Sequence, residues 1–137
     1  IEKDAVIVVG TPRWSQNVDD AANDPILGYD NLMYTLHFYA GTHKEWLRQK
    51  GNYAMSKGLA LFVTECGGMN ADGQGPVDVE STQAWIEWME DNDISYAFWS
   101  ISDKKETCSM LYPSAASEGP WHDADLSPWG AFVKECL

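Results

Sequence analysis

The stretch Leu61-Phe62-Val63-Thr64-Glu65 is a short apolar run that ends on a carboxylate. Its length and its branched side chains predict a buried strand over residues 60–64. A carboxylate at the end of such a strand must reach a cleft, the solvent or a cation, because burying an unpaired charge is costly. Glu65 is therefore either a solvated or ion-paired surface group or a functional acid that faces a cleft.

Similar strand patterns flank this run on both sides. Residues 5–9, Ala-Val-Ile-Val-Val, form a continuous apolar segment, which predicts a strand buried on both faces. Residues 32–39 and 95–101 are two further predicted strands. Four helices are indicated, the first a weak candidate at 18–23. A Thr42–Glu45 capping box opens the second, which ends before Gly58. Asp78 is the N-cap of a third helix over about 79–92, and Ser127-Pro128 opens the last one.

Strands that alternate with helices predict an α/β fold with a parallel sheet and right-handed crossovers. Two architectures fit this order. One is a small open doubly wound sheet that stands alone, and the other is half of a (β/α)8 barrel, with this chain supplying strands five to eight. All 137 residues are expected to form one unit, with no second domain.

Composition excludes several classes of partner. The chain carries 21 acidic and 9 basic residues, for a net charge of −12. Nucleic acid and anionic membrane surfaces are both excluded, since each requires clustered Lys and Arg. The longest apolar run is too short to span a bilayer. No phosphate-binding glycine turn and no metal-ligand spacing is present, so we expect no cofactor and no metal.

Polar and aromatic residues gather where the predicted strands end, which is where active sites lie in both architectures. His37 and Tyr39 are two apart on one strand and point to the same side, as partners for a carboxylate or as satisfied core groups. Trp14 follows the first predicted strand, and Trp99 lies near the end of the last one. An indole beside charged groups such as Lys104 and Glu106 is typical of a sugar site, and a core position is the rival interpretation.

Three other aromatic positions receive structural predictions. Trp46 and Trp85 follow the apolar faces of their helices and are expected in the core. His43 falls in the first turn of a predicted helix and is expected at the surface.

Four segments together resemble glycoside hydrolase family 5, and in particular its endoglucanases. They match the family in order and spacing, and the resemblance extends over nearly the whole chain, including Leu126-Ser127-Pro128 before the last helix. The segments are Thr11-Pro12-Arg13-Trp14-Ser15-Gln16, His37-Phe38-Tyr39-Ala40-Gly41-Thr42-His43, Phe62-Val63-Thr64-Glu65-Cys66-Gly67 and Trp99-Ser100-Ile101-Ser102-Asp103-Lys104-Lys105-Glu106.

The resemblance implies a (β/α)8 barrel, of which this chain is the C-terminal half, and a secreted enzyme that hydrolyses β-1,4-glucan with retention. Glu65 would be the nucleophile, and His37 and Tyr39 would support the catalytic carboxylates. Trp99 would stack on the cleaved sugar, and neighbouring subsites would be lined by Trp14, Lys104 and Glu106. Mannan and xylan stay open as substrates.

One departure from the family pattern concerns the proton donor. The family acid/base is a Glu that follows Asn, and this sequence contains no Asn-Glu dipeptide. We therefore expect the chain to be inactive alone and to pair with an N-terminal barrel half, for instance as a second chain. A non-catalytic carbohydrate-binding domain is the alternative function. In the family picture Cys66 and Cys108 could form a disulfide, and Cys136 could pair within the other half.

Overall fold

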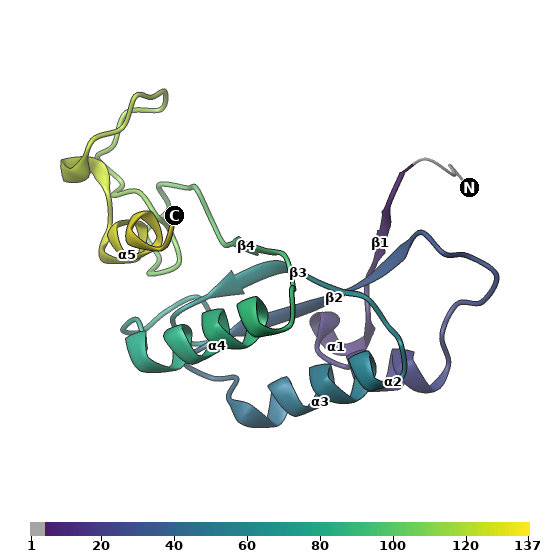
Figure 1. Cartoon of the computed structure of the whole chain (residues 1–137). Helices are drawn as coiled ribbons and strands as arrows, with labels where there is room; N and C mark the ends of the chain where they lie inside the picture. The colour runs from purple at the N-terminus through teal and green to yellow at the C-terminus, as the bar shows by residue number, and fades with distance from the viewer. Residues whose placement is uncertain (1–4) are drawn as a thin grey trace.

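A computed structural model describes residues 5–137, and its centre is a parallel four-stranded sheet (Figure 1). The strands are β1 (Ile7–Val9), β2 (Leu32–Tyr39), β3 (Leu61–Gly67) and β4 (Tyr96–Phe98), and they lie side by side in chain order. Each neighbouring pair is parallel. The predicted parallel α/β fold is therefore confirmed, and the segment 32–39 is a strand with the predicted bounds.

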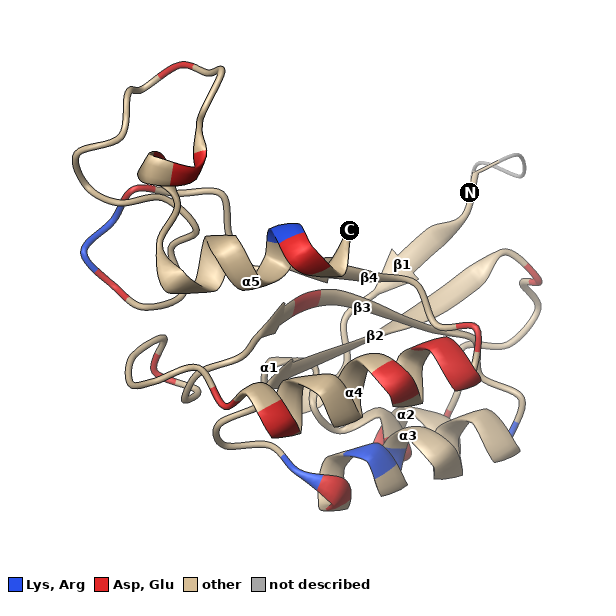
Figure 2. Cartoon of the chain, turned by 60° about the vertical axis from the view of Figure 1, so that its left-hand side comes forward, with Lys and Arg blue, Asp and Glu red and all other residues tan. Residues whose placement is uncertain are grey.

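Helices lie between the strands and after the last one. They are α1 (Pro12–Ser15), α2 (Val18–Asn23), α3 (Glu45–Ser56), α4 (Val79–Asp91) and α5 (Pro128–Cys136), with a short 3-10 turn at Asp123–Asp125. Figures 1 and 2 both show α3 and α4 side by side on one face of the sheet. Figure 2 also shows acidic positions spread over many elements, with few basic ones among them. Within residues 5–137, the helices are all too short or too polar to cross a membrane.

Two predicted helix caps are present. The Asp78 side chain accepts a hydrogen bond from the Ser81 backbone N–H, 3.0 Å away, at the start of α4. Ser127 caps α5 by accepting from the Gly130 N–H, with Pro128 in the first helical turn.

The predicted Thr42–Glu45 capping box is wrong. Lys44 is the N-cap residue of α3, and its side chain makes no capping bond. The Thr42 hydroxyl instead accepts a hydrogen bond from the Ala71 backbone N–H, 2.9 Å away. Thr42 therefore joins the loop after β2 to the loop after β3, a long-range contact that local spacing does not reveal.

Two predicted strands differ from the structure. Residues 5–9 were expected to be buried on both faces, yet β1 covers only Ile7–Val9. Val8 is exposed while Ile7 and Val9 are partly buried, so only one face of β1 is packed. The strand predicted over 95–101 ends at Phe98. From Ser100 onward the backbone hydrogen bonds go to the following loop, as from Ser100 N to Cys108 O at 3.0 Å.

The main core lies between the sheet and helices α3 and α4. Phe38 of β2 stacks on Trp85 of α4 with ring centroids 3.8 Å apart, and the Arg48 guanidinium of α3 covers the same indole. Trp85 is 0% exposed, as predicted for a core residue. Trp46 is 47% exposed, so its predicted core position is wrong. The Trp46 side chain lies at the surface, with its ring edge against the buried His43.

Replacing Trp85 tests this core. Trp85→Ala should lower the free energy of unfolding by about 3–5 kcal/mol, because it removes a fully enclosed indole and leaves a cavity. Trp46→Ala is the matched control and should cost about 1 kcal/mol or less. Urea denaturation measures both, and equal losses for the two variants would contradict this assignment of the core.

Candidate functional site

Glu65 lies near the carboxyl end of β3 and is held by a side chain from β2. The Tyr39 hydroxyl donates a hydrogen bond of 2.7 Å to Oε1 of Glu65. His37 Nδ1 lies 3.7 Å from Oε2 of the same carboxylate. The three side chains that the sequence singled out from two separate strands are therefore in contact.

A register shift in β3 produces this arrangement. Thr35 of β2 pairs with Phe62, whereas His37 pairs with Glu65, so β3 has one more residue than β2 over this interval. A β-bulge of this kind breaks the strict alternation of side chains. Thr64 and Glu65, although adjacent, both contact His37 on one face of the sheet.

Burial sets the protonation of the two partners of Glu65. Burial, with the hydrogen bond to Glu65, raises the pKa of Tyr39 far above its ordinary value of 10, so the phenol keeps its proton and remains a donor. Burial lowers the pKa of His37 below 6.5, and the opposing pull of the Glu65 carboxylate is the smaller effect. At neutral pH His37 is therefore a neutral imidazole that carries one hydrogen.

A cavity of about 760 Å³ opens in front of this group. Its wall combines an indole, hydroxyl, amide and imidazole groups with two carboxylates, a mixture that suits a ligand with flat apolar faces and many hydroxyls. The lining residues are Trp14, Ser15, Gln16, His37, Tyr39, His43, Glu65, Ala71 and Asp72.

Trp14 reaches the cavity through a left-handed turn. Arg13, Trp14 and Ser15 have φ angles of 54°, 53° and 59°. Three consecutive left-handed L-residues are strained by about 1–2 kcal/mol each. The turn leaves Trp14 84% exposed at the cavity, and backbone strain of this kind is typical of functional sites.

His43 is a cavity-lining residue that the sequence interpretation missed. It was expected at the surface, yet it is only 4% exposed and lines the cavity. It precedes α3, and its Nδ1 accepts a hydrogen bond of 2.8 Å from the Tyr39 backbone N–H. Its own carbonyl accepts from Trp85 Nε1, also at 2.8 Å. Tertiary hydrogen bonds, rather than a helical pattern, hold this imidazole in place.

The buried state of His43 predicts a pH effect on stability. Burial lowers its pKa below the 6.5 of the unfolded chain. As the pH falls, the unfolded state therefore takes up the proton before the folded state does. The contribution of neutral, buried His43 to the free energy of unfolding is present above pH 6.5 and is lost as the pH falls below it. The free energy of unfolding should fall less between pH 7.5 and 5.5 in His43→Gln than in the wild type. An equal fall in both proteins would show that His43 contributes nothing to it.

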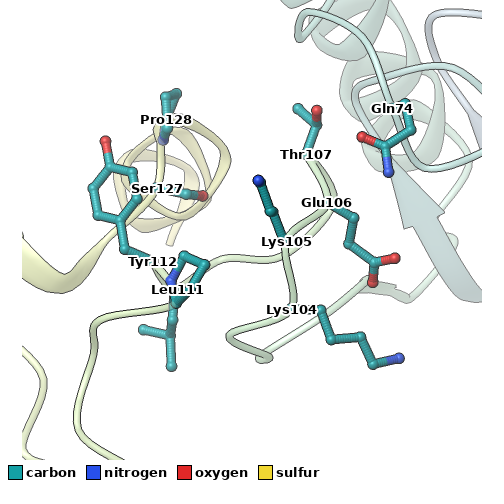
Figure 3. A pocket seen from close by; sticks show the side chains of 10 residues that line it. Gln74, Lys104, Lys105, Glu106, Thr107, Leu111, Tyr112, Ser127 and Pro128 are labelled. Atoms are coloured by element: carbon teal, nitrogen blue, oxygen red, sulfur yellow. The ribbon is translucent and has the colours of Figure 1, made fainter.

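The remaining predicted site residues lie after β4. Trp99 is exposed. Its backbone N–H donates to Cys66 O at 2.8 Å, and its backbone carbonyl accepts from Trp129 Nε1 at 2.7 Å. Lys104 and Glu106 line a second cavity, of about 430 Å³ (Figure 3). That cavity lies between the loop after β4 and the start of α5, so these two residues are not brought into the Glu65 cavity.

The Cys66–Cys108 disulfide that the sequence left possible is not formed in the structure, where Cys66, Cys108 and Cys136 are all free. Cys66 faces the helix side of the sheet, where its thiol donates to Ala97 O at 3.4 Å. Cys108 packs in a separate apolar cluster with Trp129. Burial raises the pKa of Cys66 and raises that of Cys108 to about 11, so both thiols stay protonated.

Thiol alkylation tests this correction. The unfolded protein, never exposed to reductant, should take up three alkyl groups, one at each of Cys66, Cys108 and Cys136. Intact mass spectrometry counts the labels. A single label, at Cys136, would instead support the disulfide.

Comparisons with known proteins agree with one another. The family model for Cellulase (glycosyl hydrolase family 5) matches residues 1–105. An endoglucanase of Clostridium saccharobutylicum is 47% identical over 137 residues, which is all of this chain and 30% of that protein. Endoglucanase Z of Dickeya dadantii is 55% identical over 115 residues, or 84% of this chain and 27% of that protein.

Solved structures show the same relationship. A protein from Cytophaga hutchinsonii superposes with a TM-score of 0.93 at 49% identity, covering 96% of this chain and 42% of that one. The catalytic domain of a Thermobifida fusca endoglucanase, solved with cellotetraose, has a TM-score of 0.89 at 30% identity and covers 97% of this chain and 46% of that one. The chain thus spans about 30% of the length of the curated relatives and less than half of the solved domains.

Proposed function

Because the chain belongs to glycosyl hydrolase family 5, we propose that it carries the nucleophile of a retaining endo-β-1,4-glucanase. The observation that supports this most directly is the Glu65 carboxylate, which accepts a 2.7 Å hydrogen bond from Tyr39 beside a cavity bordered by Trp14. A positioned carboxylate next to an aromatic platform is what double displacement at an anomeric carbon requires.

In the proposed reaction Glu65 attacks the anomeric carbon. Tyr39 donates its hydrogen bond to Oε1, and Oε2 is the attacking oxygen in this proposal. A bond forms between Oε2 and the anomeric carbon while the glycosidic C–O bond breaks, and a general acid gives its proton to the leaving oxygen. The same group then takes a proton from water, whose oxygen displaces Glu65 and restores the carboxylate.

The general acid is proposed to come from outside this chain. Retaining hydrolysis needs two carboxyl groups about 5–5.5 Å apart, and the family Asn-Glu pair is not found in the sequence. Within residues 5–137, β1 and β4 are the outer strands of the sheet, so each has an edge on which another strand can pair. An N-terminal barrel half that adds strands at these edges is the proposed partner.

The proposed substrate is β-glucan. Trp14 offers an apolar face for a pyranose ring, and Ser15, Gln16 and His43 offer polar groups for its hydroxyls. Trp99 is a second exposed indole. Lys104 and Glu106 line the other cavity, so in this proposal they contact sugars farther from the cleaved bond. In this proposal the enzyme is secreted, because its β-glucan substrate is a polymer outside the cell.

The test uses a chimera in which residues 1–137 replace the segment that they match in the Clostridium saccharobutylicum endoglucanase. The rest of that protein completes the barrel. Glu65→Gln in this barrel should lower turnover of carboxymethylcellulose by at least about a thousandfold, because the nucleophile is lost. The Kd for cellotetraose should change by less than about threefold, since an amide of the same shape remains.

Glu118→Gln, at an exposed loop position, is the matched control and should leave turnover unchanged. A 2-deoxy-2-fluorocellobioside with a good leaving group should label Glu65 covalently, which mass spectrometry detects. Failure to label would favour the non-catalytic carbohydrate-binding alternative, which forms no glycosyl adduct. Hydrolysis by the isolated 137-residue chain would refute the need for a partner half.

A further inference from the structure

Two side-chain hydroxyl groups, those of Thr35 and Thr64, form a row beside His37. The Thr35 hydroxyl contacts the Thr64 hydroxyl in a short hydrogen bond. Thr64 Oγ1 is in turn 2.8 Å from His37 Nε2. The other ring nitrogen, Nδ1, lies 3.7 Å from Oε2 of Glu65. The Thr64 hydroxyl is thus close to one nitrogen of the imidazole, and the Glu65 carboxylate is close to the other.

Hydrogen counting gives the row a direction. Each threonine hydroxyl has one hydrogen to donate. Thr35 is buried, and among the described residues the Thr64 oxygen is the acceptor that its hydroxyl reaches. When Thr35 donates to Thr64, the Thr64 hydrogen is left for His37 Nε2, and every hydroxyl hydrogen has an acceptor. In the reverse direction Thr64 donates to Thr35, and the Thr35 hydrogen is left without an acceptor in a buried site, which is unfavourable.

We propose that Thr35 and Thr64 are positioning residues that hold His37 in the tautomer with its hydrogen on Nδ1, facing Glu65. Nε2 is then the acceptor of the Thr64 hydrogen bond. An Nδ1–H that faces Oε2 stabilises the ionised carboxylate, whereas an Nδ1 lone pair would repel it. The catalytic consequence rests on the proposed function, and the tautomer itself does not.

The bulge in β3 is what makes this possible. In a regular strand Thr64 and Glu65 would point to opposite faces of the sheet. The extra residue in β3 lets Thr64 approach Nε2 while Glu65 approaches Nδ1. Because burial lowers the pKa of His37, the ring is neutral at pH 7.5 and has one hydrogen whose place must be chosen.

Nitrogen-15 NMR of the histidine side chains distinguishes the two tautomers directly, and it can be done on the 137-residue chain and on the complete barrel. His37→Gln identifies the signals of this ring. We expect His37 at pH 7.5 to carry its hydrogen on Nδ1. The opposite tautomer in the wild type, with the hydrogen on Nε2, would overturn the proposal without any variant.

A variant cycle separates the hydroxyl row from the carboxylate. In Glu65→Gln the hydrogen should stay on Nδ1, because Thr64 still donates to Nε2. Adding Thr64→Val should move His37 to a mixture in which the Nε2-hydrogen form rises several-fold, whereas adding Thr64→Ser should restore the Nδ1 form. Thr82→Val removes a buried hydroxyl elsewhere and should change nothing. A switch to the Nε2 form in Glu65→Gln alone would show that the carboxylate sets the tautomer.

Kinetics of the complete barrel provide a second readout. Thr64→Val should lower kcat about tenfold, the rate equivalent of one ordinary hydrogen bond, and leave KM nearly unchanged. Thr64→Ser should recover most of this loss. An Nδ1 hydrogen in a barrel that does not hydrolyse glucan would reject the proposed function alone. Hydrolysis by a barrel with the Nε2 form would reject the positioning role alone.

Discussion

The one extra residue in β3 is the constraint on which the site depends. Thr35 pairs with Phe62 and His37 pairs with Glu65, so the pairing with β2 shifts by one position between them. The pairing with β4 shifts over the same stretch. The shift brings Thr64 and Glu65 onto one face and turns Cys66 toward the helices. A regular strand would have separated the carboxylate from the hydroxyl that faces the same imidazole.

The two faces of the sheet perform different tasks. On the helix side, Phe38 and Trp85 stack in a dry core, and Arg48 covers the outer surface of the indole. On the other side, the same strands present His37, Tyr39 and Glu65 to a cavity. The packed side stabilises the sheet, and this rigidity holds polar groups at distances that isolated loops would not maintain.

Local patterns predicted most of the elements because their causes are local. The Asp78 and Ser127 caps depend on groups within one helical turn, and the strand Leu32–Tyr39 follows from its own composition. The failures share a different cause. Thr42 bonds to Ala71 instead of capping α3, and His43 is buried by contacts with β2 and α4. Each of these side chains depends on tertiary contacts, which the spacing of residues along one segment does not reveal.

The amino-acid sequence by itself determined the alternation of strands and helices, the parallel sheet and the family, because these follow from side-chain periodicity and from motifs in order. It also identified Glu65, His37 and Tyr39 as polar groups at strand ends. Tertiary structure alone decided which atoms of these groups meet, that Cys66 and Cys108 lie in separate clusters, and that Lys104 lines a different cavity. The physical reason is that strand register and loop path come from the packing of distant segments, and a shift of one residue turns a side chain to the opposite face.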